Sequence, residues 1–235
     1  MEPVFTQHIP GTRLSFDVVP IEGGSFLMGS EDPEALDREK PVHPVTVPDF
    51  YMAKYPVTQA LWKAVMGNNP SWFQGDQRPV EQVSWDDAQA FIQQLNERTG
   101  ENYRLPTDSE WEYAARGGIY GQGFKYAGSN KLKEVGWYDE NSHDETKPVG
   151  LKFPNELGLY DMNGNVWEWC QDVWHENYEG APSDGSAWME GSDQALRVVR
   201  GGSWDLDTNS CRVANRVRDN QDFRGYDVGF RLARS

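Results

Sequence analysis

The sequence is poor in residues that crosslink a chain or ligate a metal. Its 235 residues include two cysteines and four histidines. Two cysteines exclude a scaffold held by several disulfides. One bond between Cys170 and Cys211 stays open, because sequence alone cannot place the two sulfurs. No two histidines stand three or four positions apart, so the sequence contains no zinc-type spacing.

Long hydrophobic runs are also missing. No stretch of about 18 apolar residues occurs, which is the length that a membrane-spanning helix needs. The first residues, Met1–Val4, lack the basic and apolar regions of a signal peptide. We therefore expect no membrane segment and no signal peptide in this chain. The compartment stays open between the cytoplasm and display on a cell or virus surface.

Positive charge is scarce, whereas aromatic residues are abundant. The sequence has 22 Lys and Arg against 37 Asp and Glu, for a formal net charge of -15. We expect no nucleic-acid binding, because phosphate backbones repel such a chain. Aromatic residues reach 13%, including ten tryptophans, which favours an ordered fold with a Trp-rich core. The length and the lack of any linker or repeat predict a single domain over residues 1–235.

Capping residues predict three helices in the first half of the chain. Each begins at a Ser or Thr that can accept a backbone N–H, continues as an apolar stripe at helical spacing and stops at a glycine. The start and stop pairs are Thr58 and Gly67, Ser84 and Gly100, and Thr107 and Gly117. Beyond residue 118 no helical period survives, and the apolar pieces at 198–199 and 228–230 predict brief strands. The pattern predicts an α+β fold with helices first, then loops and short strands.

The composition changes sharply near the C-terminus. Residues 200–235 contain seven arginines but no lysine, glutamate or methionine. The planar guanidinium group binds carboxylates and carbonyls through two hydrogen bonds at once. We therefore expect arginines of this segment to form part of its framework.

Several strings spread along the chain resemble a known family. They are GGSFLMG at 23–29, YPVT at 55–58, PVEQVSW at 79–85, YRLPT at 103–107, EWEYAARGG at 110–118, GLYDMNGNVWEW at 158–169, RGGSW at 200–204 and GFR at 229–231. Together they resemble the formylglycine-generating enzyme family, also called the sulfatase-modifying factor family. The resemblance implies a loop-rich C-type-lectin-like fold. This family contains copper-dependent oxidases and non-catalytic binding proteins, so membership does not decide activity.

The resemblance also shows where a copper site would lie. The family's oxidases hold copper with two cysteines after the Gly-Gly-Ser-aromatic motif and convert a substrate cysteine to formylglycine. The matching positions here are Leu206 and Cys211, and leucine cannot ligate a metal. We therefore predict no copper site and no oxidase activity, with Cys211 a small buried side chain. The alternative is a copper-dependent oxidase acting on a peptide cysteine, in which Cys211 would be catalytic.

A structural calcium site is a second implication of the resemblance. Matching positions in family enzymes bind Ca²⁺ through the side chains of Asp161 and Glu168 and the carbonyls of Gly164 and Val166. Oxygen ligands of this kind suit a hard cation. The alternative is that Asp161 and Asn165 form Asx-type turns and Glu168 pairs with an arginine.

Residues 200–235 further resemble the variable segment of proteins diversified by retroelements. There, adenines in AAC codons are randomised, and the resulting codons never encode Lys, Glu, Gln, Met or Trp. Residues compatible with this process are Asp205, Leu206, Asp207, Thr208, Asn209, Ser210, Val217, Asp219, Asn220, Asp222, Phe223, Gly225, Tyr226 and Asp227. With Trp204 as a further aromatic anchor, they predict a non-catalytic face that binds a basic or polar protein ligand. The alternative is an ordinary loop of the family.

Overall fold

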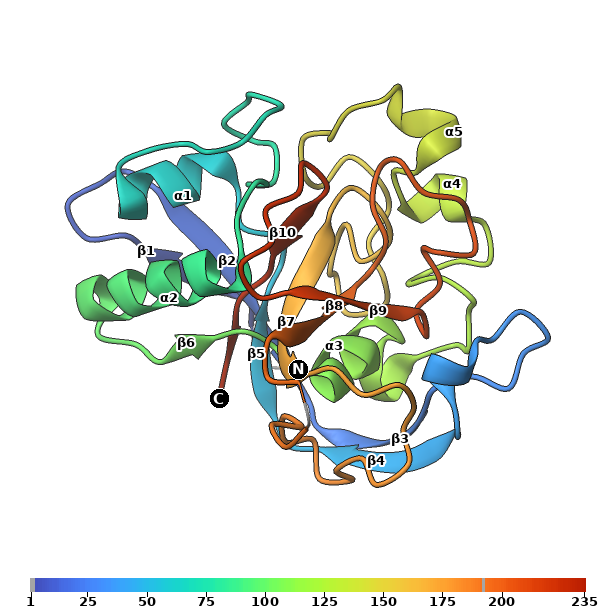
Figure 1. The fold of residues 1–235 in the computed structure, drawn as a ribbon. Coiled ribbons are helices and arrows are strands. Elements are labelled where there is room, and N and C mark those ends of the chain that lie inside the picture. Colours follow the sequence, from blue (N-terminus) through green and yellow to red (C-terminus); the bar gives the residue numbers. More distant parts are fainter. Residues whose placement is uncertain (1–2, 192) are drawn as a thin grey trace.

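The strands of the computed structural model, which describes residues 3–191 and 193–235, form three sheets (Figure 1). The largest has the order β1-β2-β5-β11-β6 and brings the last strand of the chain between β5 and β6. Its strands are β1 Phe5–His8, β2 Ser15–Ile21, β5 Phe50–Ala53, β11 Ala233–Arg234 and β6 Tyr103–Arg104.

The second sheet carries most of the C-terminal segment. Its order is β10-β7-β8-β9, with β10 parallel to β7 and the other pairs antiparallel. The strands are β7 Trp167–Val173, β8 Leu196–Arg200, β9 Arg216–Asn220 and β10 Val228–Phe230. The third sheet pairs β3 Gly24–Met28 with β4 His43–Val47. The brief strands predicted at 198–199 and 228–230 are confirmed as parts of β8 and β10.

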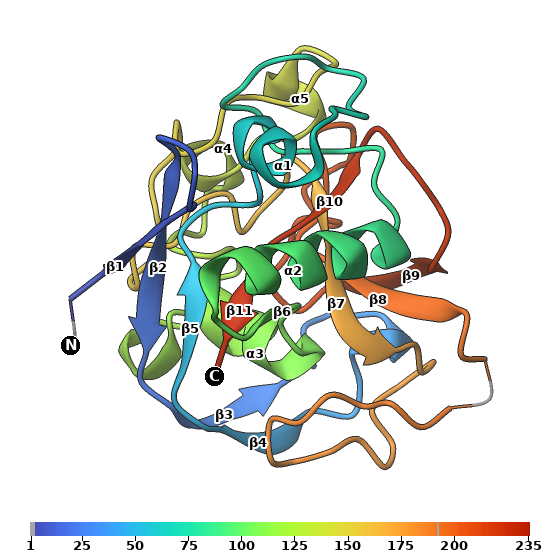
Figure 2. The ribbon, with the colours of Figure 1, turned by 90° about the vertical axis from the view of Figure 1, so that its left-hand side faces the viewer.

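The three capped helices are confirmed. They are α1 Gln59–Met66, α2 Trp85–Thr99 and α3 Asp108–Ala115. The Thr58 hydroxyl accepts the N–H of Leu61, and Ser84 and Thr107 each form a complete capping box. The helices stop as expected, because the backbone just beyond each one turns left-handed at a glycine. Figure 2 shows α2 lying across the view in front of β7.

The α+β class is confirmed, but the expected division into helices first and strands afterwards is wrong. Six strands, β1 to β6, precede residue 105. Conversely, short helices follow residue 118: α4 Leu132–Val135, α5 Asp139–Ser142 and the 3₁₀ turn η2 Gly118–Tyr120, with a further 3₁₀ turn, η1, at Asp37–Glu39. A helix of four residues is too short to show a 3.6-residue period, and strands of four or five residues such as β1, β3 and β4 give only a brief alternating signal.

Aromatic side chains fill the core, as their abundance predicts. Trp62 stacks on Phe91 with ring centroids 5.3 Å apart, and Phe91 meets Phe230 of β10 edge-on at 5.4 Å. Trp111 and Trp169 are fully buried. This packing attaches α1 and α2 to the sheet that carries the C-terminal segment. Within residues 3–191 and 193–235, no helix has the length and apolar character needed to cross a membrane.

Candidate functional site

Buried arginines fix the C-terminal segment from inside. Arg200, at the end of β8, donates to Asp108 at 2.5 Å and to Glu112 at 2.8 Å, both on α3. Arg200 and Glu112 are completely buried. Burial raises the pKa of Glu112, but Arg116 and Arg200 outweigh it, so the pKa lies below its usual value. This pair ties β8 to α3.

Two further arginines bind carboxylates far away in the sequence. Arg212 donates two hydrogen bonds of 2.6 Å to Glu39, and Arg231 donates to Glu168 at 2.8 Å. All of these side chains are buried. Such bidentate pairs hold position as well as charge. The expected framework role is therefore confirmed for Arg200, Arg212 and Arg231, which we call the arginine framework.

The predicted contact residues lie mostly at the surface between these anchors. Of the fifteen residues named above, only Trp204 and Gly225 are buried, whereas the others reach solvent in part or in full. Residues 211–216, which interrupt the contact residues, and residues 228–233, which follow them, are buried throughout. The segment thus alternates between a buried framework and exposed loops.

Gly225 does not have the character of a contact residue. It is buried, and its carbonyl accepts the N–H of Gln82. A Cβ at this position would collide with the Asp227 carboxyl and the Phe223 ring. Gly225 is therefore a turn residue. Leu206 and Val217 are half-buried and pack against the core, so they offer a ligand only part of their surface.

Aromatic rings meet where the exposed loops converge. The Trp204 ring lies edge-on to Phe73 at 5.4 Å and tilted against Tyr226 at 5.8 Å. Phe73 brings its neighbour Trp72 to this place, and Trp72 is 73% exposed. Trp72 was missed by the sequence argument, because nothing in the local sequence signals its exposure. Figure 1 shows its loop, residues 67–78, beside the turn that leads into β10.

The two cysteines do not form a pair. Both are buried free thiols. Cys211 packs with Tyr126, Leu132 and neighbours, whereas Cys170 belongs to a separate cluster around Trp111. Burial raises the pKa of each thiol, and nearby aspartates raise it further. The residues present therefore do not fit copper, because one thiol stands alone and neither is disposed to ionise.

The four predicted calcium positions only partly fit a cation. Asp161 Oδ2 accepts the N–H of Gly150 at 2.7 Å, while Oδ1 is buried without a hydrogen-bond partner. Burial raises the pKa of Asp161 to about 6. The Glu168 carboxylate, however, accepts hydrogen bonds from Arg231 and from Trp111 Nε1. The pairing of Glu168 with an arginine is confirmed, and the calcium site stays a prediction that rests on Asp161 and the carbonyls of Gly164 and Val166.

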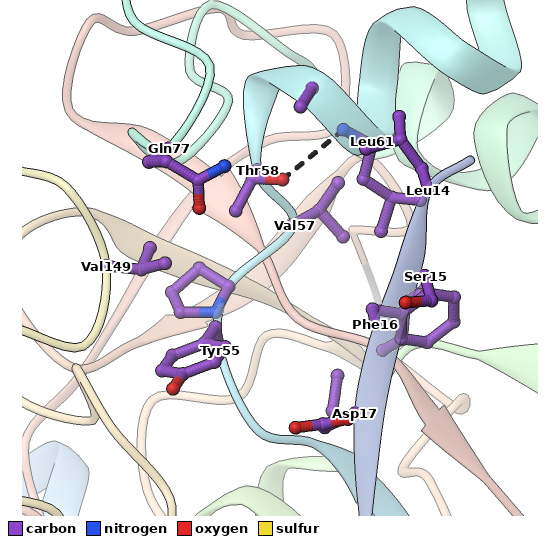
Figure 3. Close-up of a pocket in the computed structure, with 14 residues that line it drawn as sticks. Leu14, Ser15, Phe16, Asp17, Tyr55, Val57, Thr58, Leu61, Gln77 and Val149 are labelled. Carbon is purple, nitrogen blue, oxygen red and sulfur yellow. Dashed lines mark hydrogen bonds between the residues drawn. The ribbon is translucent and has the colours of Figure 1, made fainter. Parts of the chain in front are cut away.

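A separate cavity of about 330 Å³ has Ala53 and Leu232 in its lining, next to the framework residue Arg231 (Figure 3). It lies between the start of β2, with Phe16 and Asp17, and the segment that leads into α1, with Tyr55 and Val57. Among the described residues that line it, none is a predicted site residue. Within residues 3–191 and 193–235, no group of three or more His, Cys, Asp or Glu side chains is placed to hold a metal ion.

The sequence model of the sulfatase-modifying factor enzyme 1-like domain matches residues 8–235. The chain belongs to this family. A chaperone protein, LppX of Paenibacillus barcinonensis, is 36% identical over 95% of this chain and 91% of its own length. The formylglycine-generating enzyme of Thermomonospora curvata is 30% identical over 92% of each. An inactive C-alpha-formylglycine-generating enzyme 2, from Bos taurus, is 27% identical over 95% of this chain and 89% of its own length.

Among solved structures, Treponema denticola variable protein 1 covers 99% of both chains with a TM-score of 0.89 and 31% identity. The family resemblance is therefore confirmed, and so is the C-type-lectin-like fold. Because the relatives include both an enzyme and a protein named inactive, the family does not decide whether this chain is catalytic.

Proposed function

We propose that this chain is a non-catalytic member of its family that binds a protein ligand through its C-terminal face. The observation that carries the proposal is the division of residues 200–235 by burial. Their arginine framework is inside, while nearly every residue at a predicted variable position reaches solvent. Asp, Asn, Ser, Thr and Tyr side chains presented by a rigid scaffold are typical of an adaptable binding surface. The similarity to a variable protein over the whole chain supports the same role.

A peptide library tests the binding role. Peptides of seven random residues displayed on phage are selected on the wild-type protein and then tested on the double variant Phe223→Ala/Tyr226→Ala. The matched control is Ile119→Ala/Tyr120→Ala, because both pairs consist of one side chain 49% exposed and one 40% exposed. We expect clones that the first variant loses and the control retains. A library that yields no such clone would overturn the proposal.

The runner-up is a copper-dependent oxidase that acts on a peptide cysteine. Two features speak against it: Leu206 occupies the first cysteine position, and Cys211 is fully buried, which raises the pKa of its thiol. Oxygen consumption is measured with Cu(I) and a cysteine-containing peptide, with the Thermomonospora enzyme as positive control. We expect no turnover above background. Turnover that disappears in Cys211→Ser would reverse the assignment.

A further inference from the structure

Two buried side chains pin the loop that carries Trp72. Gln59 donates to the carbonyl of Phe73 at 2.7 Å and accepts from Asn69 and Gly75 at 2.9 and 3.0 Å. Glu81 Oε1 accepts the N–H of Phe73 at 2.8 Å. Gln59 and Glu81 are completely buried. The backbone at residues 69–75 is therefore held from two sides, and little conformational entropy remains to be lost on binding.

This fixed backbone displays Trp72 to solvent instead of burying it. An indole of such exposure gains little from the fold, because its apolar area stays in water. Trp and Tyr are the residues on which binding energy concentrates at protein interfaces. Trp72 thus presents an exposed indole on the loop whose Phe73 ring contacts Trp204.

The carboxylates around these rings lack basic partners. Asp139, Asp205, Asp207 and Asp227 form no ion pair with any lysine or arginine of the described residues. Elsewhere on the surface, Asp76 pairs with Lys63 and Asp87 with Arg224, whereas Asp184 and Asp193 form no such pair among the described residues.

These aspartates gather from three segments. The Asp139 N–H bonds to the carbonyl of Leu206 at 3.1 Å, which joins the start of α5 to the 204–210 loop. Burial and the charge of Asp205 raise the pKa of Asp227 to about 6. We call the set the acidic–aromatic face; its members are Trp72, Asp139, Asp205, Asp207, Tyr226 and Asp227.

A buried carboxyl, Glu81, lies beneath this face and accepts the N–H of Phe73. Glu81 Oε2 is fully buried and has no hydrogen-bond partner. Burial, and then the charge of Asp227, raise the pKa of Glu81 to about 7, so Asp227 lies within electrostatic reach of it. A cation at the surface would lower the electrostatic cost of negative charge on Asp227 and on Glu81 beneath it.

We propose that the acidic–aromatic face binds a cationic side chain, an ammonium or guanidinium group, on a basic segment of the protein ligand. The cation lies against Trp72 and Tyr226 and is hydrogen-bonded by the surrounding aspartates. This inference rests on the proposed ligand-binding function and adds an anchor to it. Trp72 and Asp139 lie outside residues 200–235, so the cation site keeps a fixed part while the loops beside it vary.

A titration with two small peptides tests the inference. Acetyl-Gly-Lys-Gly-amide and its neutral counterpart with norleucine are added while the indole N–H signals of Trp72 and Trp204 are followed by NMR. The Trp72 signal is assigned with Trp72→Phe. We expect the lysine peptide to shift both signals saturably and to bind about fivefold more tightly than the norleucine peptide. Added salt should weaken the binding of the lysine peptide but not that of the norleucine peptide.

Matched variants identify the groups responsible. Trp72→Ala should weaken binding of the lysine peptide about fivefold. Asp205→Asn/Asp227→Asn should weaken it about tenfold. The controls are Phe153→Ala, because Phe153 is 72% exposed on another loop, and Asp184→Asn/Asp193→Asn. These controls should leave binding unchanged. Equal affinity for both peptides, or equal losses in the controls, would overturn the inference.

The two proposals fail in different ways. Library clones that depend on Phe223 and Tyr226 but bind without any basic residue would leave ligand binding intact and overturn the cation site. Saturable lysine binding at Trp72 without any such clone would support the cation site and overturn the wider protein-binding role.

Discussion

The C-terminal segment uses charge in two opposite ways. In the arginine framework every charge is buried and matched, as where Arg200 meets Asp108 and Glu112 within 2.8 Å. In the acidic–aromatic face the charges reach solvent and have no basic partner among the described residues. The first arrangement fixes the backbone, and the second leaves carboxylates that can bind a cationic ligand. Residues 200–235 thus contain the arginine framework and most of the acidic–aromatic face.

The largest effect should come from breaking the framework. Replacing Arg200 with methionine leaves Asp108 and Glu112 buried with less compensation, which costs about 3–5 kcal/mol. Arg218→Met is the control, since Arg218 pairs with Glu176 at the surface and its loss costs less than about 1 kcal/mol. Urea unfolding measures both free energies. Equal losses would show that the buried pairs of the arginine framework stabilise the fold no more than a surface ion pair does.

Calcium removal should have the next largest effect if Asp161 provides a ligand. An ion that binds only the folded state adds about 2.7 kcal/mol at a free concentration one hundred times its Kd. We expect the melting temperature to be higher in calcium than in EGTA, and Asp161→Asn to abolish the difference. An unchanged melting temperature in wild-type protein would eliminate the site and leave Glu168 solely as the partner of Arg231.

Glu81 should link stability to pH. Its folded pKa of about 7 lies above the ordinary value of 4.5, so the folded state holds this proton more tightly than the unfolded state does. Its contribution is therefore favourable below about pH 4.5 and is lost as pH rises through 7. Glu81→Gln should stabilise the protein at pH 8, by on the order of 1–2 kcal/mol, and much less at pH 5. A difference in the free energy of unfolding between Glu81→Gln and wild-type protein that is the same at pH 5 and pH 8 would contradict this prediction.

The smallest stability effect is expected at the face itself. Asp205→Asn should change the free energy of unfolding by less than about 0.5 kcal/mol, because Asp205 is exposed and pairs with no described cation. Binding of the lysine peptide should instead weaken as pH falls through about 6, where Asp227 takes up a proton. Binding that stays constant between pH 8 and pH 5 would exclude Asp227 from the cation site.

Local chemistry explains what the sequence predicts well. The helix starts at Thr58, Ser84 and Thr107 are set by hydrogen bonds within four residues, and all three occur as expected. The framework role of the arginines follows from their composition bias. The identity of their partners does not, because Arg212 meets Glu39 from 173 positions away.

Other features depend on tertiary contacts that no short pattern contains. The exposure of Trp72 depends on Gln59 and Glu81, which hold its loop from different parts of the chain. The burial of Gly225 depends on the approach of Gln82. The sequence places Leu206 and Val217 among the contact residues, yet both are half-buried and pack against the core. The candidate face is thus predictable as a segment, while its anchors require the fold.

Sequencing the 3′ end of this gene and its flanking DNA in many isolates tests the central claim most directly. The account predicts substitutions confined to the exposed positions between Asp205 and Asp227, arising at adenines, with a near-copy of the segment and a reverse-transcriptase gene nearby. Arg200, Arg212 and Arg231 should stay constant. An invariant segment without a template, or substitutions that fall equally on the arginine framework, would contradict the claim.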